Sequence, residues 1–333
     1  MSGCFEKGLV AAILFSFCGC QHSRQCRCDS AEIKVGIIGC DTSHAIRFTE
    51  VLNVRKPDFA AGFRVTAAHK WGSRDIVSAT NRYEKYIAQL KDMGVEMCET
   101  VDDLLAKVDV VCLETNDGRE HLWQAEKCFR AKKRVFIDKP IAQDYPHAKK
   151  IYDLGRQLNA KYFSSSILRY SEIAQACRSG KNGRVLGAQL YAPSPIEEQG
   201  THSRFAWYGI HGFEPLVTVM GVGAESVIAV NNGDEDVSVV KYRDGRIGTV
   251  RSRHSKWDYG GTIFCERGKP VVLDPAHQGY EPLLKEICAF FRTGLVPVRP
   301  EETLEIFAIM DAADRSIQEG GREVKLSEIR NER

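Results

Sequence analysis

The residue most clearly placed to take part in a reaction is a lysine at the end of a short apolar segment. Asp138-Lys139-Pro140 directly follows Phe136-Ile137. Ligands of open parallel sheets bind outside the carboxyl ends of the strands. Lys139 is therefore placed to transfer a proton or to hold a substrate hydroxyl. A lysine at a surface strand end, without a function, is the alternative.

A histidine later in the chain is a second candidate. His211 lies between Gly209 and Gly212, near the start of an apolar segment. An imidazole there could polarise a substrate carbonyl or move a proton. A lone histidine is more often structural, so the sequence leaves both interpretations open.

A third group follows the first apolar strand. A dinucleotide site usually has the motif G-x-G-x-x-G at such a turn, because glycines let the pyrophosphate approach the backbone. The turn is Gly39-Cys40-Asp41-Thr42-Ser43-His44, with Asp41 at the second glycine position and His44 at the third. The Thr42 and Ser43 hydroxyls and the helix N-terminus still attract anions. Asp41 would repel a diphosphate or would simply cap the helix.

The end of the second strand carries no acidic residue to bind the ribose hydroxyls. Ser73 and Arg74 follow His69-Lys70 instead. If a dinucleotide binds, these groups favour the 2′-phosphate of NADP. Solvated loop charges are the alternative.

No metal site is predicted. Asp41 and His44 offer only two ligands at one helix start, and Cys26-x-Cys28 lacks a second cysteine pair or a histidine pair. Seven other cysteines lie singly in apolar segments and are expected to be small buried hydrophobic residues: Cys40, Cys98, Cys112, Cys128, Cys177, Cys265 and Cys288.

Strands and helices must alternate to position these residues. Short apolar strands are expected at 33–39, 63–68, 95–98, 109–114 and 134–137, with helices at 45–52, 76–93, 100–107 and 119–132 between them. This alternation predicts an α/β fold with an N-terminal Rossmann-like parallel sheet.

The pattern changes after Pro140. A helix is expected at 145–159 and a strand near 161–165, and then strands follow one another from 184 to 274 with almost no helix. Asp244-Gly245 predicts a hairpin turn, and two amphipathic helices, 280–293 and 301–318, close the chain. We expect a C-terminal α+β domain on a mostly antiparallel open sheet. The predicted domains are 32–142 for nucleotide binding and 143–333 for substrate binding and oligomerisation.

Composition excludes some partners. The chain has 333 residues, 43% hydrophobic residues and a formal net charge of +2, with no long basic run. Nucleic acid is therefore not an expected partner.

Residues 1–31 resemble a signal or lipoprotein segment with a tether. An apolar run, 8–17, ends in Phe17-Cys18-Gly19-Cys20, and Cys20 would carry the lipid. We therefore predict that the protein is exported and carries a lipid anchor. This anchor is the only membrane contact that we expect. A cytoplasmic protein with an N-terminal extension is the alternative.

Taken together, residues 32–320 resemble the glucose-fructose oxidoreductase/inositol dehydrogenase/rhizopine-catabolism (Gfo/Idh/MocA) family. The resemblance rests on the strand 35–39, the segment 114–121, Asp138-Lys139-Pro140, Arg169-Tyr170 and Gly209-x-His211. It implies an oxidoreductase that reduces NAD or NADP while oxidising a secondary alcohol of a sugar or polyol, and a homo-oligomer. Lys139 and His211 would contact the reacting hydroxyl.

The resemblance also assigns the remaining site residues. The cofactor would contact the turn, the strand ends and the second-strand loop, at Gly39, Asp41, Thr42, Ser43, His44, Ser73, Arg74, Thr115, Asn116 and Asp138; the substrate would contact Arg169, Tyr170 and Glu214. The chain departs from the family at Trp207, where an Asp is frequent, and at Asp138, where Glu is usual. These departures leave open a divergent non-redox member that binds, hydrolyses or isomerises a carbohydrate, and a purely structural protein.

Overall fold

The computed structural model describes residues 32–196, 200–274 and 279–331. The predicted targeting segment, its Cys20 and the tether lie outside these residues. Within the described ranges, no helix combines the length and the apolar character that a membrane crossing requires. The seven described cysteines are free thiols, and all but Cys265 are buried, as the sequence predicts.

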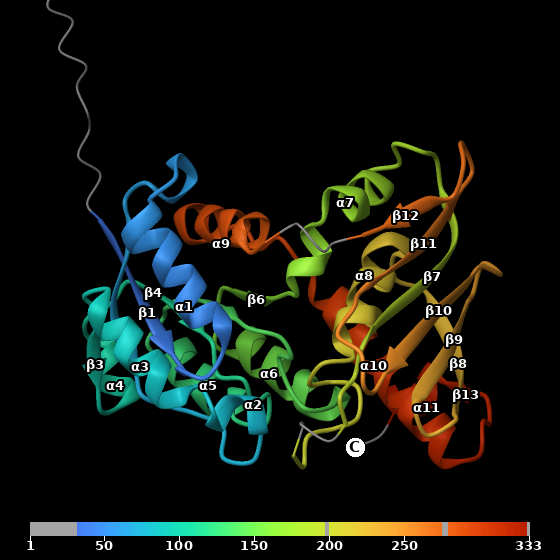
Figure 1. Cartoon of the computed structure of the whole chain (residues 1–333), viewed down its shortest axis with the longest axis horizontal. Helices are drawn as coiled ribbons and strands as arrows, with labels where there is room; N and C mark the ends of the chain where they lie inside the picture. Colours follow the sequence, from blue (N-terminus) through green and yellow to red (C-terminus); the bar gives the residue numbers. More distant parts are fainter. Residues whose placement is uncertain (1–31, 197–199, 275–278, 332–333) are drawn as a thin grey trace, which may run out of the picture. The chain divides into compact units, whose positions relative to one another are not determined.

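The first sheet contains six parallel strands within the described residues, in the order β3-β2-β1-β4-β5-β6 (Figure 1). The strands are β1 (Ile33–Ile38), β2 (Phe63–His69), β3 (Glu96–Cys98), β4 (Val110–Leu113), β5 (Arg134–Ile137) and β6 (Tyr162–Ser164). All four residues of β4 are buried, as expected for a strand covered on both faces. The predicted Rossmann-like parallel sheet is confirmed.

Helices connect these strands. They are α1 (Ser43–Thr49), which continues as a π-helical segment (Glu50–Arg55), a 3₁₀ turn (Asp58–Ala60), α2 (Val77–Thr80), α3 (Tyr83–Asp92), α4 (Val101–Leu105), α5 (His121–Arg130) and α6 (Tyr145–Gln157). The predicted single helix at 76–93 is wrong, because a turn at Asn81 and Arg82 separates α2 from α3. Val77, Thr80 and Asn81 are weak helix formers, which accounts for the interruption.

The parallel sheet extends beyond the predicted domain boundary at residue 142. Strand β6 pairs in parallel with β5. Helix α9 (Glu281–Thr293) also returns to this sheet, where Leu283 and Ile287 join the hydrophobic core that contains Val35 of β1. The first sheet is therefore completed by segments from the second half of the chain.

The second sheet has the order β12-β11-β7-β10-β9-β8-β13 among the described residues. Its strands are β7 (Val185–Pro193), β8 (Ala224–Asn231), β9 (Glu235–Tyr242), β10 (Ile247–Arg253), β11 (Gly260–Cys265), β12 (Val271–Leu273) and β13 (Val324–Lys325). All pairs are antiparallel except β7 with β10. The predicted hairpin at Asp244-Gly245 joins β9 to β10, and Gly245 has the positive φ of 84° that such turns require.

One helix interrupts the stretch 184–274, where almost none was expected. Helix α8 (Ile210–Met220) is buried along its whole length and packs between α10 (Pro300–Gln318) and the sheet. The sequence conceals it, because Gly212 and Pro215 are poor helix formers and a helix that is apolar on every side shows no period. The remaining helices are a 3₁₀ turn (Ile167–Tyr170), α7 (Glu172–Arg178) and α11 (Leu326–Arg330).

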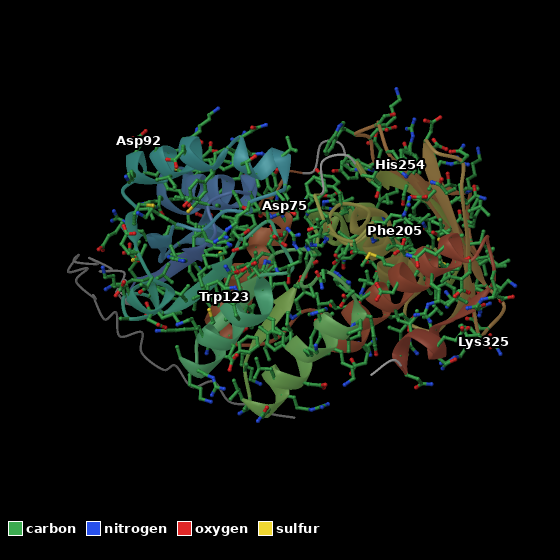
Figure 2. The ribbon with its side chains drawn as sticks, turned by 90° about the horizontal axis from the view of Figure 1, so that it is seen from below. Asp75, Asp92, Trp123, Phe205, His254 and Lys325 are labelled. Carbon is green, nitrogen blue, oxygen red and sulfur yellow. The ribbon has the colours of Figure 1, made fainter. Side chains whose placement is uncertain are left out.

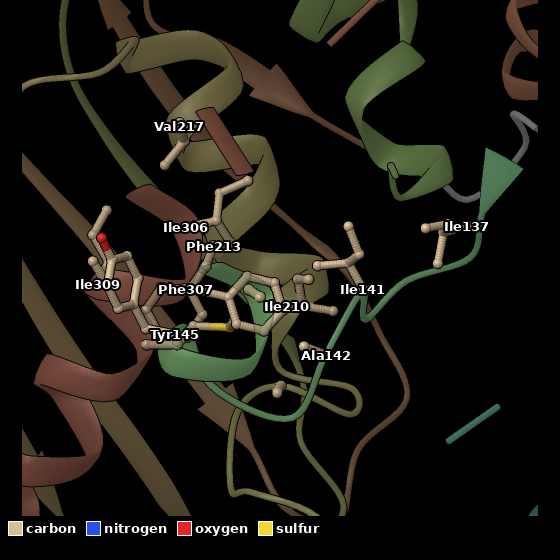
Figure 3. Packing of buried hydrophobic residues seen from close by; sticks show 14 of the residues in the cluster. Ile137, Ile141, Ala142, Tyr145, Ile210, Phe213, Val217, Ile306, Phe307 and Ile309 are labelled. Atoms are coloured by element: carbon tan, nitrogen blue, oxygen red, sulfur yellow. The ribbon is translucent and has the colours of Figure 1, made fainter. Parts of the chain in front are cut away.

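Helix α8 is held against the segment that follows Lys139-Pro140. Ile141 and Ala142 belong to one buried cluster with Ile210 and Phe213 of α8 and Phe307 of α10 (Figure 3). Close-packed side chains of this kind fix the backbones that carry them. The cluster therefore sets the position of the end of β5 relative to the start of α8.

Candidate functional site

A pocket of about 700 Å³ lies at the carboxyl ends of β1, β4 and β5 and extends to the second sheet. That volume is in the usual range for a small-molecule site. Its walls combine hydroxyl, cationic, imidazole and aromatic groups from Thr42, Ser43, His44, Ser78, Arg82, Asn116, Asp138, Lys139, Ile167, Leu168, Tyr191, Trp207, Tyr208, His211, Trp257, Asp258, Tyr259, Asp274, Gly279 and Tyr280. The position at parallel strand ends is the one expected for a ligand of this fold.

Both predicted catalytic residues line this pocket, and both contact Tyr208. The ammonium of Lys139 lies 4.7 Å from the centre of the Tyr208 ring and donates to the Trp207 carbonyl over 3.4 Å. The imidazole of His211 meets the same ring edge-on, with the ring centres 4.9 Å apart. Burial lowers the pKa of Lys139 below its ordinary value. The tertiary fold thus brings Lys139 and His211 to one wall.

Ser166 orients His211. Its Oγ lies 2.7 Å from Nδ1 of His211 and accepts a hydrogen bond from the Leu168 amide over 3.2 Å. The arrangement that satisfies the Ser166 hydroxyl hydrogen is donation to Nδ1. Burial holds the pKa of His211 well below its ordinary value, so the ring is neutral and its hydrogen resides on Nε2.

Glu214 supports this arrangement from behind. Its carboxylate accepts hydrogen bonds from the Ser166 amide at 2.8 Å and from the Ser165 hydroxyl at 2.7 Å. Arg169 donates its Nε to Glu214 over 2.8 Å and its Nη1 to Glu302 over 2.7 Å. Arg169 and Glu214 are both buried. These residues form an ion-pair network beneath the pocket.

The three predicted substrate residues are not among the lining of the pocket. Arg169 and Glu214 are engaged in the network just described, and Tyr170 lines a different, shallower hollow beside α9. Glu214 reaches the site only through Ser166 and His211. The structure therefore gives these residues supporting positions.

The carboxylate of Asp41 points away from the pocket. It is fully buried and accepts hydrogen bonds from the Ser73 amide and hydroxyl, both at 2.7 Å, and from the Asn116 amide at 3.0 Å. Burial raises its pKa to about 6. Asp41 does not cap α1; the side chain of Thr42 does, accepting from the Ala45 amide. Asp41 instead ties together the loops that follow β1, β2 and β4.

The residues at the start of α1 fit the phosphate and nicotinamide end of a dinucleotide. Thr42 and Ser43 line the pocket where the helix N-terminus lies, whereas the Asp41 charge does not. The hydroxyl of Thr115 is buried and has no hydrogen-bond partner. Gly39 has a φ of +95°, and an added Cβ would lie 2.4 Å from the Thr115 amide nitrogen. The tight turn of a Rossmann site is therefore kept without the later glycines.

Ser73 and Arg74 lie in a separate hollow with Trp71, Asp75 and Arg119. The Ser73 hydroxyl is donated to Asp41, and the Arg74 guanidinium lies over the Trp71 ring, 5.9 Å from its centre. In the same region, the carboxylate of Asp75, labelled in Figure 2, accepts from the Thr201 hydroxyl at 2.9 Å. The structure does not bring Ser73 and Arg74 into the main pocket.

Two buried carboxyl groups, those of Glu114 and Asp138, lie beside His44 at the strand ends. Nδ1 of His44 lies 2.8 Å from Oδ2 of Asp138 and 3.7 Å from Oε2 of Glu114. Burial, together with the neighbouring Asp138, raises the pKa of Glu114 well above its ordinary value. Burial also acts to raise the pKa of Asp138, but His44 and Lys139 outweigh it and hold that pKa below its ordinary value. Ionisation is therefore easier for Asp138 than for Glu114.

Several residues of the site escaped the sequence analysis. Tyr208 contacts both Lys139 and His211, and Ser166 contacts His211. Aromatic side chains add further walls to the pocket: Trp257, Tyr259 and Tyr280. Tyr208 stands three residues before His211 in the sequence, and this closeness was a usable signal. Ser166 follows β6 and is joined to His211 only by the tertiary fold.

Comparison with known proteins agrees with this geometry. Residues 33–166 match a family model, GFO_IDH_MocA, described as an oxidoreductase family with an NAD-binding Rossmann fold. The match contains the turn that leads into α1, Lys139 and Ser166. No curated protein is similar enough in sequence to match the chain.

Solved structures share the fold of most of this chain. A scyllo-inositol dehydrogenase from Lactobacillus casei with bound NAD(H) and scyllo-inositol has 18% identity and a TM-score of 0.69, over 89% of this chain and 99% of that one. A myo-inositol dehydrogenase from the same organism, in complex with NAD(H) and myo-inositol, has 17% identity and a TM-score of 0.67, over 88% and 96%. The similarity extends across both sheets.

Proposed function

We propose that the chain is an NAD(P)-dependent oxidoreductase that acts on a secondary alcohol of a sugar or polyol. The observation that carries this proposal is the convergence of Lys139 and His211 on Tyr208, in the pocket that also reaches the start of α1. A proton-handling pair and an anion-binding helix end are the parts that such a reaction needs. The inositol dehydrogenases with the same fold, solved with NAD(H) and an inositol, support this choice.

Each part of the reaction has a residue to perform it. When bound, the nicotinamide ring supplies the hydride acceptor. With its side chain as the neutral amine, which its lowered pKa favours, Lys139 would take the hydroxyl proton as the carbon loses its hydride, so that the alcohol becomes a ketone. The Nε2 hydrogen of His211 would donate to the same oxygen and stabilise its developing negative charge. Thr42 and Ser43 would hold the cofactor, and Arg82 adds a cation to the lining.

The aromatic walls suit a ring with apolar faces and polar edges. Tyr208 contacts Trp257 with ring centres 5.0 Å apart, and the Tyr259 hydroxyl donates to that of Tyr208 over 3.0 Å. A sugar or cyclic polyol presents axial C–H groups to such rings and hydroxyl groups to Lys139 and His211. The lining therefore supports the proposed substrate class.

The test begins with the cofactor. Purified full-length protein is expected to release NAD or NADP on acid treatment, or to melt at a higher temperature when one of them is added. A panel of sugars and polyols then identifies the substrate through the absorbance of the reduced nicotinamide. Failure of both dinucleotides to bind would contradict the proposal. Melting shifts with sugars alone would then favour the non-redox carbohydrate protein.

We also propose that the chain is exported and anchored by a lipid on Cys20. The apolar run that ends at Gly19-Cys20 supports this. Incorporation of a labelled fatty acid into the wild type, lost in Cys20→Ser, is expected in a bacterial host. Equal labelling of both proteins, or a soluble cytoplasmic product, would contradict it.

A homo-oligomer is proposed through the second sheet. Val230 on β8 and Ile247 on β10 are more than half exposed, and apolar side chains on an open sheet face favour burial against another subunit. Light scattering should give a mass above that of one 37.3 kDa chain, and Ile247→Lys should lower it. A monomeric wild type would contradict the proposal.

A further inference from the structure

The structure assigns a second role to the strand ends, beyond the proposed oxidoreductase chemistry. Three ligating atoms converge there: Nδ1 of His44 after β1, a carboxylate oxygen of Glu114 after β4 and one of Asp138 after β5. All three lie within 4.8 Å of one another, and all three side chains are buried. The group is formed by residues far apart in the sequence, which only the parallel sheet brings together.

Polar atoms of this group lack partners. Both carboxylate oxygens of Glu114 are buried without a hydrogen bond, and so is Nδ1 of His44. The 2.8 Å separation between that nitrogen and Asp138 is short, but its orientation is not that of a hydrogen bond. Burying such atoms without a partner destabilises the fold, because each has lost its hydrogen bonds to water. The arrangement indicates a binding partner between the three side chains.

The spacing suits a metal ion. Nitrogen and oxygen ligands lie roughly 2.0–2.2 Å from a divalent transition metal, so neighbouring ligand atoms are separated by about 2.8–3.6 Å, from octahedral to tetrahedral angles. The separations of 2.8 and 3.7 Å from Nδ1 of His44 to Asp138 and Glu114 bracket this range. One imidazole with two carboxylates is a ligand set that Mn²⁺ and Zn²⁺ accept.

We propose that His44, Glu114 and Asp138 bind one divalent transition-metal ion. His44 and Asp138 line the pocket, whereas Glu114 is completely buried behind them. The open coordination positions would therefore face the pocket, where a water or a substrate oxygen can bind. Asp41, the acid nearest to His44 in the sequence, takes no part because Ser73 and Asn116 occupy its carboxylate.

Binding of Mn²⁺ to chelator-treated full-length protein tests this proposal without any need for activity. When Mn²⁺ is added to the protein, the electron paramagnetic resonance signal of free Mn²⁺ should stay absent until one equivalent has been added. Glu114→Gln should weaken this binding at least about 100-fold, and His44→Gln likewise. Asp258→Asn is the matched control, because Asp258 lines the same pocket outside the three-residue group, and it should bind as the wild type does.

Two further measurements test whether the metal binds at cysteines instead and whether the variant is folded. The chain has 12 cysteines, so Co²⁺ spectra are recorded: nitrogen and oxygen ligands give weak visible bands, whereas thiolates add intense near-ultraviolet bands. Glu114→Gln should melt as the wild type does in chelator, because glutamine has nearly the same size and shape as glutamate and fits the same buried position. Equal Mn²⁺ binding by the wild type and Glu114→Gln, or no binding by a folded wild type, would overturn the proposal. Either result leaves the dinucleotide test unaffected.

Discussion

The Oγ atom of Ser166 lies 2.7 Å from Nδ1 of His211. This contact joins the loop after β6, at the edge of the first sheet, to the start of α8, beside the second. Glu214, one turn further along α8, accepts the Ser166 amide hydrogen at 2.8 Å. The histidine thus has a hydroxyl partner and a buried carboxylate behind it.

Ser166→Ala should lower kcat/KM by about 10–100-fold, because the His211 ring loses the bond that selects its tautomer. The loss should fall mainly on kcat. Steady-state kinetics on the identified substrate provide the measurement. Ser165→Ala is the matched control: Ser165 donates to Glu214 and not to His211, so its kcat should stay within a few-fold of wild type. Equal losses in both variants would assign Ser166 a purely structural role.

Lys139→Met should lower kcat by about 10²–10⁴-fold, the usual contribution of a positioned proton acceptor. Binding of the dinucleotide should persist, since Thr42 and Ser43 are unchanged, and the melting shift with cofactor measures it. Lys149→Met removes an exposed lysine that pairs with Asp153 and should leave both quantities unaltered. A Lys139→Met enzyme with near wild-type turnover would refute the assigned role.

Gly39→Ala should destabilise the protein by more than about 2 kcal/mol. The new Cβ would suffer both the positive φ and a 2.4 Å approach to the Thr115 amide. Gly180→Ala separates the two effects, because Gly180 has a φ of +77° but no atom within 4 Å; its cost should be only about 1 kcal/mol. Urea unfolding compares the variants, and equal costs would show that the approach to Thr115 relaxes freely.

The Glu302 carboxylate should make stability depend on acid pH. Burial opposes its ionisation, but Arg178 and Arg169, which donate to it at 2.7–2.8 Å, lower its pKa from 4.5 to about 2. A depressed folded pKa stabilises the fold above pH 4.5 and loses that contribution as the pH falls toward 2.

Glu302→Gln should therefore cost about 2–3 kcal/mol near neutral pH and progressively less toward the lower value. Unfolding curves across that range, for wild type and variant, measure the difference. Glu301→Gln changes the neighbouring, exposed residue of α10 and should show no such trend. A difference that stays constant with pH would contradict the assignment to this carboxylate.

Local sequence patterns were sufficient to predict most of the architecture. The run Val35–Gly39 and the apolar segments 110–113 and 134–137 identified the parallel strands, because buried strands need continuous apolar residues whatever lies around them. The same patterns failed at α8, whose uniform burial removes the helical period. They also could not show that β6 and α9 return to the first sheet.

The sequence by itself determined the types of chemistry at the strand ends: a lysine after β5, a histidine beside glycines, and a turn with Asp41 in place of a glycine. The tertiary structure decided which of these side chains meet. It turned Asp41 inward to Ser73 and Asn116, placed Glu114 and Asp138 beside His44, and joined Ser166 to His211. The reason is physical: the order of strands in a sheet, and not distance along the chain, sets which strand ends are neighbours.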